Sequence, residues 1–196
     1  YDLPSVQVVS TRSEREFGRS VFQLLEEEHE YRAQVLKDTQ GELNEMVENT
    51  VDYRKKTGKS MPMILLVVDE FETLLGNDEL SKDIMKSLEK LVEQGRATGI
   101  HIILAGQYMN LPEKISSLMA VRFALPGSSN ILKSDNNGVE LLKEYQVVFN
   151  DNRGDKNRNQ IISVMYVSKK LPNILRQVSE LEAGKEYENL MFPQQK

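Results

Sequence analysis

Apolar residues in this chain form two short, almost continuous runs and several longer periodic stretches. The first run covers residues 63–68 and leads directly to Asp69 and Glu70, and the second covers residues 100–105 and leads to Gln107. Short runs rich in Val, Ile and Leu are typical of strands that are buried on both faces of a parallel sheet. We therefore predict two such strands, each followed by polar side chains.

A helix is predicted between these two strands. Asp78 or Asn77 can cap its start, and Gly95 marks its end. Its apolar positions recur at helical intervals, at Leu80, Ile84, Leu88, Leu91 and Val92. Because strands joined by a crossover helix run parallel, the polar residues after both runs are expected at one edge of the sheet. That edge is where open α/β sheets bind ligands.

Weaker patterns predict the elements on either side. A capping box that begins at Ser13 opens a helix with a solvated acidic cluster, and Arg32 is near enough to that cluster for a weak surface pair. A short amphipathic helix and a loop are expected within residues 38–60. The other expected elements are strands at residues 6–9 and 121–125, an antiparallel hairpin of residues 145–149 and 161–167, and a last amphipathic helix over residues 171–181, capped by Gly184.

The paired carboxylates have two interpretations. In the first, Asp69 binds Mg²⁺ directly or through water, and Glu70 polarises the water that attacks the γ-phosphate of ATP. In the second they only join a strand to a helix, because Asp and Glu are favoured at helix starts. Gln107 is either a sensor of the γ-phosphate or a polar residue that ends a strand, and the residues alone leave these alternatives even.

A second candidate phosphate site is Gly58-Lys59-Ser60, which matches the end of a P-loop. A working P-loop has a further Gly five places before its GK[ST] element, follows a strand and opens a helix, because its backbone N–H groups must converge on the phosphates. Here the corresponding place is Tyr53, and Met61-Pro62 and a strand follow. We therefore interpret this stretch as an ordinary loop.

Composition narrows the class of protein. The 196 residues, 39% hydrophobic and 28% charged, suit one globular domain. The absence of Cys and the presence of only two His argue against zinc sites, disulfides and thiol catalysis. A net charge of −5 argues against nucleic-acid binding through a broad basic face. No apolar run approaches the roughly 18 residues that cross a bilayer, so a cytoplasmic location is expected. The chain opens at Tyr1, which suggests a piece of a longer protein.

Two stretches together carry a resemblance to a known family. Residues 65–71, Leu-Leu-Val-Val-Asp-Glu-Phe, and residues 91–107, which contain Arg96-Ala97-Thr98-Gly99-Ile100-His101 and end at Gln107, resemble the FtsK/SpoIIIE group of the FtsK/HerA superfamily. These proteins are hexameric RecA-like ATPases that pump double-stranded DNA. The resemblance extends over about residues 1–167. It implies an α/β fold, with a RecA-like P-loop NTPase core of mostly parallel sheet flanked by helices, a C-terminal antiparallel hairpin, and the N-terminal Walker A part missing.

The resemblance also implies roles for four residues. Asp69 would bind Mg²⁺, Glu70 would be the catalytic base, and Gln107 would be the sensor, with ATP and Mg²⁺ as cofactors. Arg96 would be an arginine finger that reaches the nucleotide of a neighbouring subunit. The alternative for Arg96 is a cation that compensates the dipole at a helix C-terminus.

The function that the resemblance implies is that of a motor. Residues 1–184 would be the distal half of a hexameric ATP-driven motor domain that translocates double-stranded DNA, and residues 185–196 a loose tail. The parent would be cytoplasmic, with any membrane contact through parts outside this chain, and the chain alone would be inactive for lack of Walker A. The sequence after Gln107 departs from that of the DNA pumps, so a protein-translocating secretion ATPase is an alternative. The missing Walker A loop leaves a catalytically silent oligomerisation or docking module as a second alternative.

Overall fold

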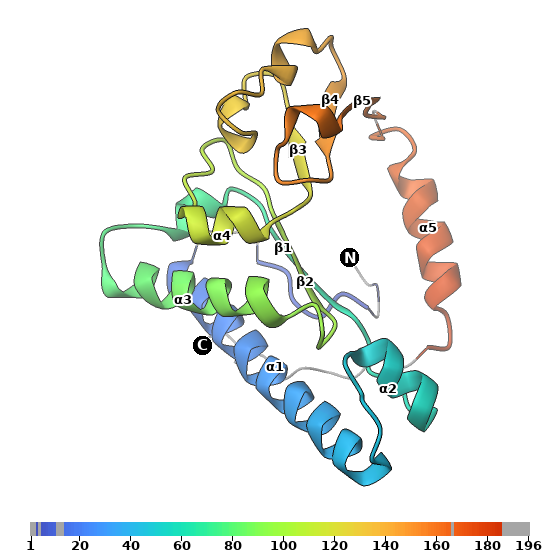
Figure 1. The fold of residues 1–196 in the computed structure, drawn as a ribbon. Helices are drawn as coiled ribbons and strands as arrows, with labels where there is room; N and C mark the ends of the chain where they lie inside the picture. The colour runs from blue at the N-terminus through green and yellow to red at the C-terminus, as the bar shows by residue number, and fades with distance from the viewer. Residues whose placement is uncertain (1–2, 4, 11–13, 166, 186–196) are drawn as a thin grey trace.

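The computed structural model describes residues 3, 5–10, 14–165 and 167–185, and Figure 1 shows the path of the chain. The helices are α1 (Arg15–Leu43), α2 (Thr50–Thr57), α3 (Glu79–Gln94), α4 (Glu113–Leu118) and α5 (Leu171–Glu182). The strands are β1 (Ile64–Val68), β2 (Ile100–Leu104), β3 (Arg122–Ala124), β4 (Gln146–Asn150) and β5 (Asn159–Ser163). Short 3-10 turns join them, of which η1 (Phe71–Leu74) follows β1 directly.

The predicted strand–helix–strand unit is confirmed. β1 and β2 pair in parallel, with Ile64 opposite Ile100 and Val68 opposite Leu104, and α3 connects them. The side chain of Asp78 caps α3 by accepting a hydrogen bond from the Ser81 N–H. Together with the antiparallel strands that follow, this unit gives the α/β fold predicted from the sequence.

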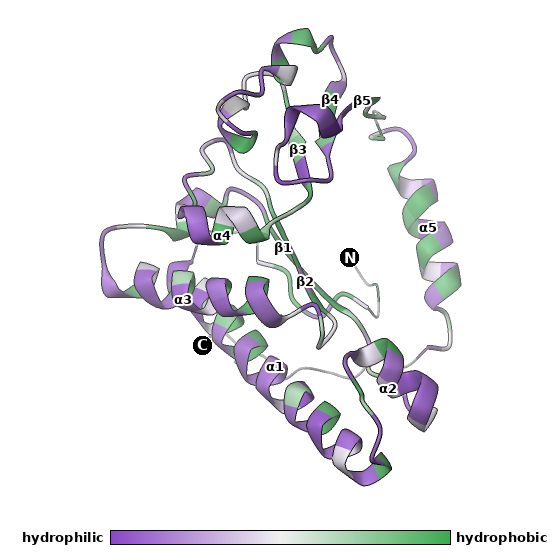
Figure 2. Ribbon diagram, in the orientation of Figure 1, coloured by the Kyte–Doolittle hydropathy of each residue, from purple (hydrophilic) through white to green (hydrophobic). Residues whose placement is uncertain are grey.

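The main core lies between this sheet and two helices. α1 and α3 pack against each other and against one face of the sheet, and Figure 2 shows hydrophobic stripes on both helices. α1 contributes Phe22 and Leu25, and α3 contributes Ile84, Leu88 and Leu91. Ile64, Leu66 and Val68 of β1 pack against this cluster, as do Ile102 and Leu104 of β2.

Burial on both faces of the sheet, as the apolar runs predicted, is wrong. Residues alternate between partly buried and exposed along β1, and the side chains of Leu65, Val67 and Ile103 are 59%, 58% and 50% exposed. The reason is that α1 and α3 cover a single face. The continuous apolar run therefore marks a sheet with one covered face and one open apolar face.

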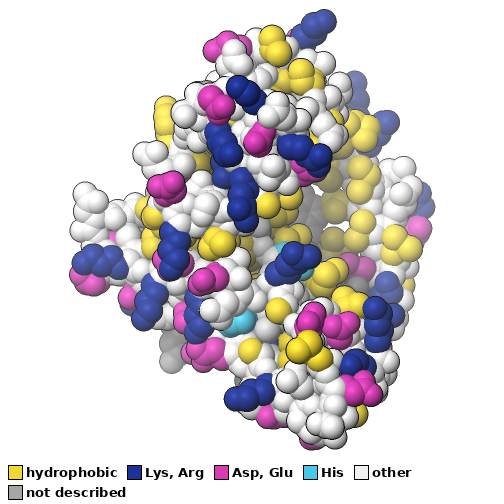
Figure 3. Space-filling view, viewed as in Figure 1, with side chains coloured by type: hydrophobic (Ala, Val, Ile, Leu, Met, Phe, Trp, Pro, Cys, Tyr) yellow, Lys and Arg dark blue, Asp and Glu magenta, His cyan; other side chains and the backbone are white. Residues whose placement is uncertain are grey.

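The predicted antiparallel hairpin is confirmed, but its second strand is Asn159–Ser163 and β3 adds a third strand to it. β3, β4 and β5 pair in that order, and Ala124 and Val148 lie in a small core of their own with Leu132 and Val139. The opposite face of the sheet carries Phe123, which packs against Phe149 with ring centroids 5.2 Å apart. Hydrophobic side chains line the hollow between this part of the molecule and α5 (Figure 3).

Buried asparagines fix the long tip of the β4–β5 hairpin. Asn150 donates to the carbonyl oxygen of Asp155 at 2.8 Å, and its own side-chain oxygen accepts from the N–H of Gly154 at 2.8 Å. Asn136 reaches the same tip from a neighbouring loop and bonds to the side chain of Asn159. These amide contacts satisfy backbone groups that the tip would otherwise leave unpaired.

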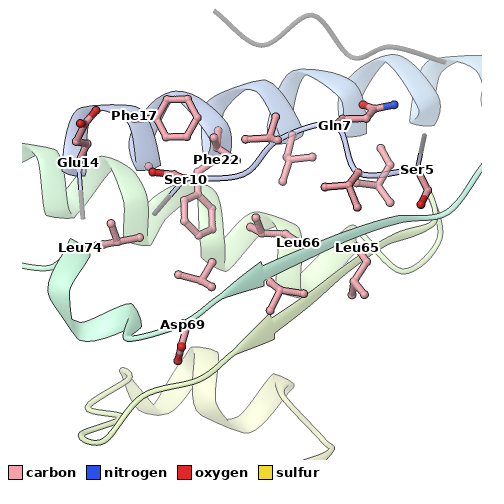
Figure 4. Close-up of a pocket in the computed structure, with 18 of the residues that line it drawn as sticks. Ser5, Gln7, Ser10, Glu14, Phe17, Phe22, Leu65, Leu66, Asp69 and Leu74 are labelled. Atoms are coloured by element: carbon pink, nitrogen blue, oxygen red, sulfur yellow. The ribbon is translucent and has the colours of Figure 1, made fainter. Parts of the chain in front are cut away.

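Two expectations at the chain ends are changed. Residues 6–9 are not a strand: Val6 donates its N–H to the Leu3 carbonyl oxygen, and Ser5 bonds to the carboxylate of Glu182 in α5. The segment runs between α1 and β1 without joining the sheet (Figure 4). The predicted capping residue Ser13 lies outside the described residues, as does the predicted tail after residue 185.

The remaining helices differ from the prediction mainly in length. α1 continues to Leu43, where Asn44 adopts a left-handed conformation, and α2 is capped by Asn49. α5 begins with Leu171 and Pro172 and is followed by Gly184 with a φ of 76°, as predicted. Among the helices of the described residues, none has both the length and the apolar character needed to cross a membrane.

Candidate active site

The candidate site begins with a bulge at the carboxyl end of β1. The Ala105 N–H donates to the Val68 carbonyl oxygen at 2.8 Å, and the Phe71 N–H donates to the Ala105 carbonyl oxygen at 3.0 Å. Both bonds continue the pairing of β1 with the segment after β2, yet Asp69 and Glu70 lie between them and take no part in it. The two acids therefore form a bulge outside the strand pairing. It lies at the carboxyl edge, where open α/β sheets generally bind ligands.

The bulge requires an unusual backbone conformation. Glu70 has φ 50° and ψ 48°, in the left-handed region that disfavours side chains with a Cβ at a cost of about 1–2 kcal/mol. The Asp69 carboxylate accepts the Glu70 N–H at 3.0 Å and so supports this conformation. Both acidic side chains are exposed. Strain of this kind is concentrated at functional sites, where the surrounding fold maintains it.

Gln107 lies at the same edge, as the sequence predicted. Its side chain is exposed, and its backbone N–H donates to Glu72 Oε1 at 2.8 Å. Glu72 belongs to η1, directly after the acids, and was not among the predicted site residues. Burial alone would raise the pKa of its carboxyl, but the N–H groups of Glu72 itself, Gln107 and Tyr108 outweigh burial and hold the pKa below its ordinary value. The sequence signal for this contact is weak: a Glu after the acids and a Gly before Gln107.

The donor set at this edge fits a magnesium ion that is shared with phosphate. Mg²⁺ keeps several waters and is commonly held by one or two carboxylates together with phosphate oxygens. Within the described part of the chain no group of three or more His, Cys, Asp or Glu side chains could form a closed metal site by itself. The exposed Asp69 carboxylate matches the open kind of site.

The stretch that imitates a P-loop lies elsewhere. Gly58, with φ 72°, ends α2 by donating its N–H to the Arg54 carbonyl oxygen, and Lys59 and Ser60 follow it toward the start of β1. This is the amino edge of the sheet, opposite Asp69. The structure therefore separates Gly58-Lys59-Ser60 from the acids, which agrees with the interpretation of this stretch as an ordinary loop.

A cleft of about 940 Å³ runs along β1 toward the acids. Its walls are the N-terminal segment, α1 and β1, and Figure 4 shows Asp69 among the lining residues, at the end of β1. Most of the lining is apolar, with Val6, Val8, Phe22 and Leu66 among the residues that form it. Such a lining suits an apolar ligand group better than it suits a triphosphate.

Arg96 lies at the opposite edge of the sheet from the other predicted site residues. It occupies the turn between α3 and β2, and its side chain is exposed. β2 is five residues long, so at about 3.3 Å per residue Arg96 is on the order of 15 Å or more from Gln107 of its own chain. The structure thus brings Asp69, Glu70 and Gln107 to one edge and leaves Arg96 at the other.

The turn that carries Arg96 is fixed from α1. Thr98, 1% exposed, contacts His29 Nδ1 through its hydroxyl at 2.9 Å, and its carbonyl oxygen accepts from Arg32 Nη1 at 3.0 Å. The predicted pair between Arg32 and the acidic cluster forms, with Glu28, but it is buried and does not lie at the surface. Arg32 is 3% exposed, bonds Glu28 at 2.6 Å, and joins α1 to the segments that enter both strands. The sequence showed that Arg32 is close to several acidic residues. It did not indicate that Arg32 bonds to backbone carbonyl groups.

Comparison with known proteins shows which proteins share sequence and fold with this chain. No family model matches the chain. The type VII secretion system protein EssC of Staphylococcus aureus (strain MRSA252) is 28% identical over 114 residues, which are 55% of this chain and 8% of EssC. Among solved structures, the pCW3 conjugation coupling protein TcpA, in its monomer form with ATPγS, matches with a TM-score of 0.67 and 22% identity over 86% of this chain and 49% of TcpA.

Two further solved structures have the same fold. The cytoplasmic domain of the Thermomonospora curvata type VII secretion ATPase EccC has a TM-score of 0.73 and 18% identity over 97% of this chain and 23% of EccC. EssC (ATPases 2 and 3) from Geobacillus thermodenitrificans has a TM-score of 0.67 and 14% identity over 97% of this chain and 37% of that chain. The chain thus spans less than half the length of each of these four proteins.

These comparisons define a class. The chain has the α/β fold of P-loop ATPase domains, and the predicted resemblance to FtsK/SpoIIIE-type ATPases is confirmed in its fold.

Proposed function

We propose that this chain is the distal half of an ATP-driven motor domain and supplies the hydrolytic edge of its nucleotide site. The observation that carries the proposal is the bulge after β1, which turns Asp69 and Glu70 out of the sheet next to Gln107. The fold of P-loop ATPase domains supports the proposal, and one structural neighbour, TcpA, was solved with ATPγS.

Each site residue has a separate task in this proposal. Asp69 holds Mg²⁺, which neutralises charge on the phosphates when it is bound. Glu70 accepts a proton from the attacking water, and the amide of Gln107 orients that water or senses the γ-phosphate. Asp69 and Glu70 are exposed, so both carboxylates are accessible to nucleotide and water.

Arg96 cannot reach this site within one chain, because the length of β2 separates them. We assign it to the nucleotide of a neighbouring subunit, where a cation stabilises charge on the transferring phosphoryl group. This assignment requires an oligomer, and we propose a homo-oligomeric, hexameric ring in a cytoplasmic parent protein. The loop of backbone N–H groups that binds phosphates would come from the part of the parent before this chain, so the chain alone would hydrolyse no ATP.

The cargo has two candidates. Double-stranded DNA is the cargo that the sequence resemblance implies, and TcpA is a conjugation coupling protein. A polypeptide is the second candidate, because EccC and the EssC of Staphylococcus aureus belong to type VII secretion. The two candidates differ in one measurable property: a DNA motor hydrolyses ATP faster when duplex DNA is added.

The proposal is tested by steady-state ATP hydrolysis in the full-length parent protein. Glu70→Gln is expected to keep ATP affinity and to lower turnover by about 10² to 10⁴, the usual contribution of a general base. Glu93→Gln, at an exposed site on α3, is the matched control and should hydrolyse ATP at the parental rate. If Glu70→Gln and the parent hydrolysed ATP at equal rates, Glu70 would only join the strand to the following helix and would have no catalytic role. If the parent hydrolysed no ATP, the catalytically silent docking module would be favoured.

A further inference from the structure

The side chain of Glu72 extends the pairing between β1 and β2 beyond their last backbone hydrogen bond. The last backbone bond of the ladder joins the Phe71 N–H to the Ala105 carbonyl oxygen at 3.0 Å. One residue further along, the carboxylate of Glu72 accepts the N–H of Gln107 at 2.8 Å. A side chain thus takes the place of a main-chain carbonyl group, and it connects the loop of Asp69 and Glu70 to the loop of Gln107.

Gly106 makes room for this carboxylate. A Cβ atom at position 106 would lie 2.1 Å from Glu72 Oε2 and 3.0 Å from its Cδ, far closer than atoms can approach. The atoms that would clash are the far end of a flexible side chain, so a larger residue at position 106 would push the carboxylate aside without disturbing the backbone. Glu72 and Gly106 therefore form one unit, in which the position of the Glu72 carboxylate depends on glycine at position 106.

The second carboxylate oxygen of Glu72 is enclosed. Oε2 is buried and lies against Gly106, where a Cβ atom would be 2.1 Å from it. The bond from the Gln107 N–H to Oε1 and the close fit against Gly106 together hold the carboxylate in place.

We propose that Glu72 is a positioning residue that sets Gln107 against Asp69 and Glu70, with Gly106 providing the space for its carboxylate. This inference rests on the proposed function, because it gives Glu72 a task in ATP hydrolysis. Glu72 touches no reacting atom. It acts through the backbone of Gln107, and its loss allows the sensor amide to move relative to the two acids.

The contact itself is tested without any activity, by amide hydrogen exchange of Gln107 in this chain, followed by NMR. Glu72→Ala is expected to speed exchange at Gln107 by about 10-fold or more, the scale of one charge-assisted hydrogen bond, and to leave the amide of Ile102 in β2 unchanged. Glu72→Gln keeps an acceptor oxygen and should keep most of the protection. Unchanged exchange at Gln107 in Glu72→Ala would overturn the inference.

Gly106→Ala sharpens this test, because its effect should depend on Glu72. In the parental background it is expected to displace the carboxylate and to speed exchange at Gln107 as Glu72→Ala does. In a Glu72→Ala background it should have no further effect, since the contact is already lost. Gly41→Ala is the matched control, because a Cβ at position 41 meets nothing within 4 Å. Additive effects of Glu72→Ala and Gly106→Ala would contradict the proposed unit.

Kinetics in the full-length parent test the positioning role. Glu72→Ala is expected to lower kcat by up to about 10²-fold, the scale of a misplacement near 1 Å, with the KM for ATP almost unchanged, and Glu72→Gln should restore most of the rate. Faster exchange at Gln107 together with an unchanged kcat would show that the contact is only structural and overturn the inference while the proposed function stands. A parent that hydrolyses no ATP would remove the proposed function and this role for Glu72, while exchange still decides whether the contact exists.

Discussion

The two edges of the β1–β2 sheet are built in opposite ways. At the carboxyl edge, the acids Asp69 and Glu70 and the amide of Gln107 are exposed, and backbone geometry and one carboxylate hold their positions. At the amino edge, charged and polar side chains are buried: Arg32 and Thr98 are only 3% and 1% exposed and bond to each other's segment. The carboxyl edge leaves its polar side chains exposed, whereas the amino edge buries Arg32 and Thr98 as links between elements and leaves Arg96 exposed.

This difference shows why charge alone does not identify a functional residue. Arg32 and Arg96 both lie near the amino edge. The Arg32 side chain already donates hydrogen bonds to three partners, Glu28, Pro62 and Thr98. Arg96 extends from the turn that these contacts fix, with its side chain in solvent. A buried network therefore serves as a rigid base for an exposed cation, and substitutions at the two arginines should have different kinds of effect.

The largest effect is expected at Arg96. Arg96→Ala should lower kcat for ATP hydrolysis in the parent by about 10³ or more, the scale known for arginine fingers, while nucleotide affinity stays nearly unchanged. Arg176→Ala, which removes an exposed cation from α5, is the control and should leave kcat unchanged. If Arg96 only compensates a helix dipole, its loss would lower stability by about 0.3–1 kcal/mol and spare turnover.

The effect of Arg32 should appear in stability. Arg32→Ala leaves Glu28 and two backbone carbonyl groups without their partner, and removal of one member of a buried ion pair typically costs about 3–5 kcal/mol. Urea unfolding of this chain measures the change. Arg176→Ala should stay within about 0.5 kcal/mol of the parent. If Arg32→Ala lowered the free energy of unfolding by as little as Arg176→Ala does, the contacts of Arg32 would not be what holds the amino edge together.

A smaller effect, of opposite sign, is expected at the bulge. Glu70→Gly removes the Cβ that the left-handed conformation disfavours, and it should raise the free energy of unfolding by about 0.5–1 kcal/mol after the added freedom of the unfolded chain is subtracted. Glu93→Gly on α3 should instead lower it by about 1 kcal/mol. Thermal unfolding distinguishes the two, and a loss at Glu70 as large as at Glu93 would show that the bulge is unstrained.

The smallest effect concerns pH and the contact between α1 and α3. A hydrogen bond from the Ser87 hydroxyl, aided by Lys90, holds the pKa of Glu26 below its ordinary value. The stabilisation is therefore complete above the ordinary Glu pKa and is lost as the pH falls through the lower pKa of the folded state. Ser87→Ala should shift this loss toward higher pH in unfolding curves recorded below about pH 5. A profile that Ser87→Ala leaves unchanged would show that this bond does not set the pKa.

The elements that the sequence predicted well are those whose signal is periodic burial. Apolar runs and helical spacing located β1, α3 and β2, and Asp78 and Gly184 marked helix ends as expected, because caps use a few residue types at fixed positions. From this arrangement alone, Asp69, Glu70 and Gln107 could be placed at one edge.

The features that the sequence did not predict depend on single contacts between distant segments. An open apolar face of a strand and a buried one have the same sequence pattern. The pattern shows which residues of β1 are apolar, but it does not show whether another element covers them. The left-handed conformation of Glu70 and the bond from Gln107 to Glu72 arise only when both loops are in place. Arg32 likewise pairs with carbonyl groups, which leave no trace in the side-chain pattern.

The division of labour between the two edges is tested most directly by mixing two inactive forms of the parent, one with Arg96→Ala and one with Glu70→Gln. If Arg96 acts on a neighbour's nucleotide, some interfaces in mixed rings join an intact Glu70 to an intact Arg96, and ATP hydrolysis returns. The recovered rate should be largest near equal amounts of the two forms. Mixed rings that form, as shown by co-purification of differently tagged subunits, and yet hydrolyse no ATP at any ratio would contradict the assignment of the two edges to neighbouring sites.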